Sequence, residues 1–155
     1  MVAVPEVVSI GDYALIGDTQ TAALVGRDGS VDWLCLPRFD AGACFAALLG
    51  DRGNGRWRLA PADSSASATR RYLPDTLVLE TTFTTSTGVV RVLDCMPIRG
   101  EAPNVVRVVE GVRGRVAMHL DLVIRFDYGA FVPWIRRVDG GLQAVAGPDA
   151  VELRT

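Results

Sequence analysis

The sequence predicts an all-β fold, an antiparallel sandwich of two sheets with one short helix. Apolar and polar residues alternate with a period of two along most of the chain, which is the pattern of half-buried strands. Turn signals rich in Gly and Asp separate these segments, so that about ten strands follow one another, mostly antiparallel. The 155 residues suffice for one domain with its own core but not for two.

A hairpin is predicted first, and the same alternation then predicts the later strands. Residues 21–25 and 30–36 flank Asp28-Gly29, a pair that accepts the positive φ angles of a tight turn. Residues 104–112 and 115–128 are expected to pair in the same way around Arg113-Gly114. The remaining strands are predicted at residues 56–60, 76–85, 89–96, 134–138, 142–146 and 150–155, with a polar loop at residues 61–69.

The one helix is predicted over residues 41–49. Apolar residues there recur at i, i+3, i+4, i+7 and i+8, the spacing of one apolar helix face. Asp40 is placed to cap the N-terminus of this helix, and Gly50 is placed to end it.

Composition excludes several classes of function. The chain has no Lys, so a phosphate-binding P-loop and a Schiff-base lysine are both excluded. Its 16 basic residues are balanced by 18 acids and form no basic stripe, which argues against nucleic-acid binding. No apolar stretch reaches the ~18 residues of a membrane span. A single His and three Cys without metal-ligand spacing predict no metal site, and no cofactor motif is present.

Two further patterns bear on location and chemistry. The N-terminal residues lack the basic start of a signal peptide, and Cys35, Cys44 and Cys95 each lie in an apolar run, which predicts reduced, buried thiols and a cytoplasmic protein. Asp32 lies in a strand that is apolar on both faces, so a buried partner is expected, such as an Arg or backbone amides. The five Glu occupy polar strand positions, turns or chain ends, as ordinary solvated acids do.

Two stretches of the chain resemble the start of bacterial glycoside hydrolase family 15 proteins, the glucoamylase-like and trehalase-like enzymes. The first stretch comprises Ile10-Gly-Asp-Tyr-Ala-Leu-Ile-Gly-Asp18, residues 21–40, Phe45-Ala-Ala-Leu-Leu-Gly-Asp51 and Gly55-Arg-Trp57. The second is Arg125-Phe-Asp-Tyr-Gly129, followed by Pro133-Trp134. The resemblance covers nearly the whole chain.

The resemblance implies a role without catalysis. In that family an N-terminal β-sandwich precedes an (α/α)6 barrel, which carries two catalytic Glu and hydrolyses α-glucosidic bonds with inversion. Residues 1–155 resemble the sandwich alone, as a single domain, so no catalytic residue can be carried over. The implied partners are the catalytic barrel and, in the full enzyme, an α-glucoside such as a maltooligosaccharide or trehalose.

Individual residues can be assigned to this role by analogy. The first stretch is expected to face the barrel near the mouth of the substrate pocket, although Arg38 and Asp40 could instead only brace their loop and cap the helix. The candidates for the barrel-facing side are Trp33, Pro37, Arg38, Phe39 and Asp40. The residues expected to shape the motif structurally are Asp12, Tyr13, Gly17, Asp18, Asp32, Arg125, Asp127 and Trp134.

Two other functions remain open at this stage. Exposed aromatic residues would suit a free-standing carbohydrate-binding module, although aromatic side chains at strand positions more often pack in a core. A purely structural module that helps the barrel to fold is the other alternative. Residues 150–155 read as a strand with no turn after it, so either this strand closes a sheet or the natural protein continues. Alone, the domain would expose its barrel-facing surface, which makes a homo-oligomer a further expectation.

Overall fold

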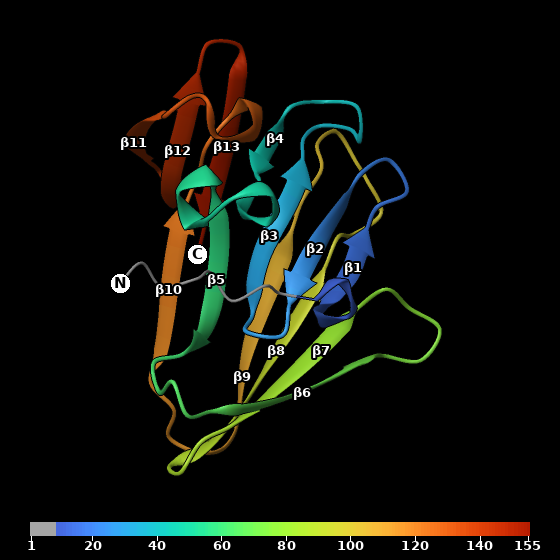
Figure 1. Cartoon of the computed structure of the whole chain (residues 1–155), viewed down its shortest axis with the longest axis vertical. Coiled ribbons are helices and arrows are strands. Elements are labelled where there is room, and N and C mark those ends of the chain that lie inside the picture. Colours follow the sequence, from blue (N-terminus) through green and yellow to red (C-terminus); the bar gives the residue numbers. More distant parts are fainter. Residues whose placement is uncertain (1–8) are drawn as a thin grey trace.

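The computed structural model describes residues 9–155 and is built from β-strands (Figure 1). The N-terminal residues 1–8, where the sequence lacks a signal-peptide pattern, lie outside the described part. The strands are β1 (Tyr13–Gly17), β2 (Ala22–Gly26), β3 (Ser30–Cys35), β4 (Ala43–Phe45), β5 (Arg56–Pro61), β6 (Ser67–Tyr72), β7 (Leu79–Thr84), β8 (Gly88–Cys95), β9 (Val106–Gly114), β10 (Met118–Val123), β11 (Trp134–Val138), β12 (Gly141–Ala146) and β13 (Asp149–Arg154). Single 3-10 turns occur at η1 (Ile10–Asp12), η2 (Ala47–Leu49), η3 (Arg52–Asn54) and η4 (Asp127–Gly129).

The strands form three antiparallel sheets. The first has the order β1-β2-β3-β5-β10, with β4 paired to β3; the second has the order β6-β7-β8-β9; and the third is the meander β11-β12-β13. Figure 1 shows the first two sheets as the front and rear layers of a sandwich, with the third sheet beside their upper end. The predicted all-β antiparallel fold is thus confirmed, and a small third sheet is added to the two expected layers.

The core lies between the two large sheets. Along β8 the residues alternate between buried and half-buried, as the period of two predicts. One cluster joins Leu59 of β5 to Phe83, Val90 and Val92 of the rear sheet. A second and larger cluster includes Ile16, Val25, Val31, Leu34, Cys44, Phe45, Leu79, Met96, Phe126 and, from the third sheet, Ala144.

The predicted helix over residues 41–49 is wrong. Ala43–Phe45 form β4, whose three residues are all buried, and η2 contributes only a single turn after it. Because both faces of β4 are covered, its apolar residues are consecutive, and a short apolar run fits a strand as well as a helix. Asp40 caps no helix; it is exposed and pairs with Arg38. Gly50 does follow the last residue of η2.

Two other expectations about strands are corrected. Residues 104–112 and 115–128 do not form a hairpin, because β9 pairs with β8 in the rear sheet whereas β10 pairs with β5 in the front sheet. The chain crosses between the layers after Gly114, whose φ is +68°. The last three residues of the predicted loop 61–69 instead begin β6, an edge strand whose small and polar residues are held by pairing with β7. The hairpin of β2 and β3, with Gly29 at φ +78°, is confirmed.

Candidate functional site

Asp18 fixes the turn between β1 and β2 at one end of the sandwich. Its side chain is fully buried, and its Oδ1 atom accepts hydrogen bonds from the backbone N–H groups of Gln20 (3.0 Å) and Thr21 (2.9 Å). Arg99, in the connection from β8 to β9, donates from Nε to Oδ2 at 2.8 Å. Burial opposes the charged carboxylate, but these hydrogen bonds outweigh it and hold the pKa of Asp18 below its usual value. A buried ion pair therefore ties this turn to the rear sheet.

The sequence around Asp18 suits such a turn. Gly17 lies against the carbonyl oxygen of Thr21, which a Cβ atom would approach to 3.0 Å. Thr19 has a φ of +75°, a conformation that is rare for a β-branched residue. Backbone strain of this kind persists only where the surroundings hold it, and here the Asp18 hydrogen bonds do so.

The loop of residues 37–40, which we call the Phe39 loop, rests on this turn. The backbone N–H of Phe39 donates to the carbonyl oxygen of Gln20 at 3.1 Å. Within the loop, Arg38 donates from Nε to Asp40 Oδ1 at 3.1 Å, and both side chains are more than half exposed. This agrees with the expected bracing of the loop by Arg38 and Asp40. Figure 1 shows the β3–β4 loop, the β1–β2 turn and the β8–β9 connection at the same end of the molecule.

The loops at this end present large apolar side chains to solvent. Phe39 is 62% exposed, and Ile98, next to Arg99, is 98% exposed. Pro37, which follows a cis peptide bond, is exposed as well. An exposed side chain on a mobile loop would need no explanation, but these lie next to backbone that a buried ion pair and a hydrogen bond hold in place. Phe39 and Ile98 are thus exposed apolar side chains on anchored backbone.

The two stretches that carry the family resemblance meet beside β4. The ring of Trp33 lies 5.9 Å from that of Tyr128, at an angle of 40°. Asp127 and Tyr128 both have positive φ angles, +50° and +59°, in the turn η4. Asn54 holds this strained turn by donating from Nδ2 to the carbonyl oxygen of Tyr128 at 3.2 Å. Trp33 is therefore half-buried against the second stretch, whereas the Phe39 loop that follows it is exposed.

Arg125 and Trp134 lie on either side of η4. Arg125 is half-buried, and its backbone N–H donates to the carbonyl oxygen of Cys44 at 3.2 Å, which joins the second stretch to β4. Trp134 begins β11 and is 86% exposed. Arg125 thus belongs to the framework, and Trp134 lies on the surface of the third sheet.

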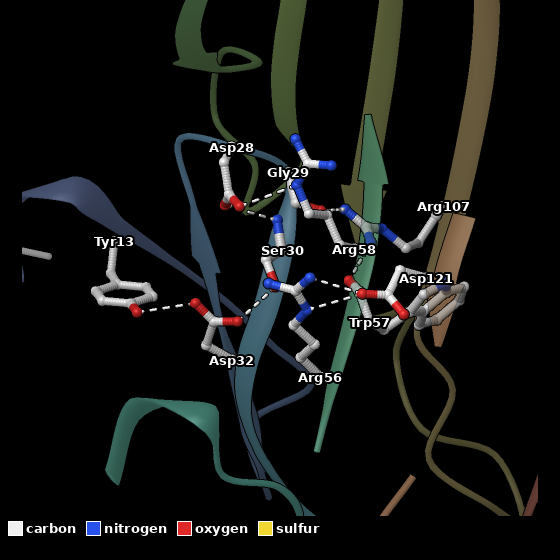
Figure 2. Close-up of polar contacts among 10 residues, drawn as sticks. All are labelled: Tyr13, Asp28, Gly29, Ser30, Asp32, Arg56, Trp57, Arg58, Arg107 and Asp121. Carbon is white, nitrogen blue, oxygen red and sulfur yellow. Dashed lines mark hydrogen bonds and ion pairs between the residues drawn. The ribbon is translucent and has the colours of Figure 1, made fainter. Parts of the chain in front are cut away.

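Asp32 finds its partners in two hydroxyl groups (Figure 2). Tyr13 donates from its hydroxyl to Oδ2 at 2.9 Å, and Ser30 Oγ donates to Oδ1. Asp32 is half-buried, and within residues 9–155 its carboxylate is served by these hydroxyl groups and not by an Arg or a backbone amide, which corrects that expectation. Burial and the neighbouring Asp32 carboxylate raise the pKa of Tyr13. Asp12 forms an exposed ion pair with Arg27 at 2.7 Å.

Sequence reasoning missed the most buried ion pair of the described residues, that of Arg107 and Asp94. Their side chains are each 1% exposed and lie 2.8 Å apart. Arg107 also donates to the carbonyl oxygens of Trp57 (2.7 Å) and Gly29 (2.8 Å), and its guanidinium lies 5.2 Å from the Trp57 ring. Figure 2 shows Arg107 beside Gly29 and Trp57. The alternation of β8, which puts Asp94 on the same face as Val90 and Val92, is the signal that could have revealed it.

Within residues 9–155, no group of three or more His, Cys, Asp or Glu side chains could hold a metal ion. No helix in the same range is long and apolar enough to cross a membrane.

Comparison with known proteins identifies the family. A family model described as trehalase-like, N-terminal, matches residues 3–155. The chain belongs to this family. No solved structure matches this trehalase-like N-terminal domain.

The curated relatives of this trehalase-like domain are much longer proteins. The trehalase of Mycolicibacterium smegmatis is 48% identical over 87 residues, which are 56% of this chain and 13% of that protein. The trehalase of Mycobacterium tuberculosis is 36% identical over 138 residues, covering 77% of this chain and 20% of that protein. Trehalase 1 of Sulfolobus acidocaldarius is 36% identical over 128 residues, covering 83% of this chain and 22% of that protein. The chain therefore spans about a fifth or less of these relatives.

Proposed function

We propose that the chain is the non-catalytic N-terminal domain of a trehalase-like α-glucosidase, and that it packs on a catalytic barrel through the Phe39 loop. Its family and the small share of its relatives that it spans support a domain that serves a larger enzyme. On this proposal residues 1–155 form one domain, and the chemistry resides in the barrel.

The exposure of Phe39 and Ile98 beside anchored backbone is the observation that carries this proposal. A rigid apolar side chain loses little conformational freedom when it is covered, so it contributes more to an interface than a flexible one. The exposed Arg38–Asp40 pair adds polar groups at the rim, where substrate hydroxyls or barrel residues would meet them. The Phe39 loop would thus form part of the wall of the substrate pocket.

The substrate and the location of the enzyme follow from the same proposal. The relatives are named trehalases, which favours trehalose among the α-glucosides, with maltooligosaccharides as the other candidates. All three Cys are free, Cys35 and Cys44 are buried, and burial raises the pKa of the Cys44 thiol to about 12. Unreactive free thiols suit the reducing cytoplasm, which we propose as its location.

The test is made in the protein expressed from its natural reading frame. In the 155-residue chain alone, where Phe39 is exposed, Phe39→Ala should leave the thermal midpoint unchanged. In the full-length protein kcat/KM for trehalose should fall about tenfold, because pocket and interface contacts are lost. Arg38→Ala should act in the same direction. Leu77→Ala, which removes another half-exposed apolar side chain, is the matched control and should leave kcat/KM unchanged. Wild-type kinetics in the Phe39→Ala protein would refute the proposal.

A carbohydrate-binding module is the second candidate, because Trp134 offers a large exposed ring on which a sugar could stack. Calorimetric titration of the isolated chain with trehalose, maltose and maltooligosaccharides separates the two functions. Saturable binding that Trp134→Ala abolishes would favour the module, whereas the domain proposed above binds no sugar alone.

A further inference from the structure

The sandwich is open along one side, between β9 and β10. β9 is the last strand of the rear sheet, and among the described strands it pairs with β8 alone, so its other edge has no strand partner in residues 9–155. β10 is the last strand of the front sheet. Figure 1 shows that β9 lies behind β3, whereas β10 lies on the far side of β5 with no strand of the rear sheet behind it.

Apolar side chains face this opening from both sheets. Val109 pairs with the buried Val92, which places it on the inner face of the rear sheet, yet it is 43% exposed. Leu120 pairs with the buried Leu59 on the inner face of the front sheet, yet it is 44% exposed. Side chains at such positions are normally covered, because they face the core of a sandwich. Here the rear sheet ends at β9, so no further described strand of this sheet lies next to β9 to cover these two side chains.

The first half of β9 has apolar side chains on both faces. Val109 lies on the inner face, and Val106 and Val108, on the outer face, are 37% and 45% exposed. Strands with two apolar faces usually lie inside a sheet. Edge strands are normally protected by Pro, Lys or charged side chains. On β9 the exposed charges, Glu110 and Arg113, lie in the second half of the strand, and Arg107 in the first half is engaged in the buried pair with Asp94.

We propose that a strand from the polypeptide that follows Thr155 in the full-length protein pairs with the free edge of β9 and covers Val109 and Leu120. The relatives are roughly four times as long as the chain, so they contain such polypeptide. In the view of Figure 1 the C-terminus falls on the β10 side of the molecule. A strand fits better than a helix, because only a strand satisfies the unpaired backbone groups of β9. The proposal shares with the proposed function the premise of a longer protein, but it concerns a different face.

Thiol labelling and hydrogen exchange of the protein expressed from its natural reading frame test this proposal. Val109→Cys and Leu120→Cys should each react at least ~100-fold more slowly than the control Ser86→Cys, which lies in the exposed β7–β8 turn. The amide hydrogens of β9 that point away from β8 should be protected to a similar degree. Neither measurement depends on the Phe39 loop, so failure here leaves the kinetic test above unaffected.

Four outcomes would overturn the proposal. The first is a reading frame that ends at Thr155. The second is labelling of Val109→Cys and Leu120→Cys at rates within about threefold of the control. The third is slow labelling with fast amide exchange along β9, which would mean that another domain, and not a strand, covers the opening. The fourth is protection that disappears on dilution, which would identify a second copy as the partner.

Discussion

At the scale of single residues, Arg107 joins the two layers. It comes from β9, donates hydrogen bonds to the carboxylate of Asp94 on β8, and also donates to two carbonyl oxygens of the front layer. Its donors thus serve a buried carboxylate and the carbonyl oxygens of Trp57 and Gly29, the second of which also accepts from the backbone N–H of Leu59. Removing one member of a buried pair leaves the other charge without compensation, so the pair is strongly coupled to folding.

Arg107→Met should lower the free energy of unfolding by about 3–5 kcal/mol, because it leaves Asp94 buried without a partner. Arg154→Met is the matched control. It breaks the exposed pair with Glu152 and should cost less than about 1 kcal/mol. Urea titration followed by circular dichroism measures both values. Equal losses in the two variants would contradict this account of Arg107.

At the scale of elements, the segment 41–49 shows how burial overrides a periodic pattern. A helix would bury Leu48 and Leu49 on the same face as Phe45, but they are 42% and 63% exposed. The segment is instead a strand that adds to β3 through Leu34 and Phe45. Its apolar residues follow from its place between neighbouring layers and not from a helical face.

Phe45→Ala should therefore destabilise the protein by about 3–5 kcal/mol, since Phe45 is 3% exposed and its removal leaves a cavity. Leu49→Ala should change the free energy of unfolding by no more than about 0.5 kcal/mol. The same chemical denaturation measures the two variants. A large loss for Leu49→Ala would restore the helical interpretation.

At the scale of the whole molecule, the chain has many large apolar side chains that none of its own described strands covers. Trp134, Ile135, Phe131 and Val132 are each more than half exposed around the third sheet, in addition to the Phe39 loop and the open side at β9. Monomeric proteins rarely leave such contiguous apolar patches uncovered. In the proposed enzyme the catalytic domain and the added strand would cover part of this surface.

The 155-residue chain by itself should consequently self-associate. Light scattering coupled to size exclusion should give a mass above 16.6 kDa that rises with protein concentration. Leu120→Asp, which places a charge at the open side, should shift this equilibrium towards the monomer. A monodisperse monomer at high concentration would contradict the prediction.

Much of the site was visible in the sequence, and the reason is that its signals are local. The Phe39 loop, Asp18 and the aromatic residues lie within short motifs, so the resemblance located them. The contacts that hold these residues in place, however, join segments that are far apart in the sequence. Arg99 lies 81 residues from Asp18, and Tyr128 lies 74 residues from Asn54, which holds its turn. No spacing rule connects positions so far apart.

The sequence by itself determined that this protein is built of antiparallel strands, because alternation and turn residues depend only on neighbours along the chain. Only the tertiary structure decided that β9 and β10 lie in opposite sheets, that residues 43–45 form a strand, and that Asp94 and Arg107 are buried together. The local sequence pattern of each of these segments is compatible with several strand pairings. The packing of strands that are distant in the sequence selects one of them.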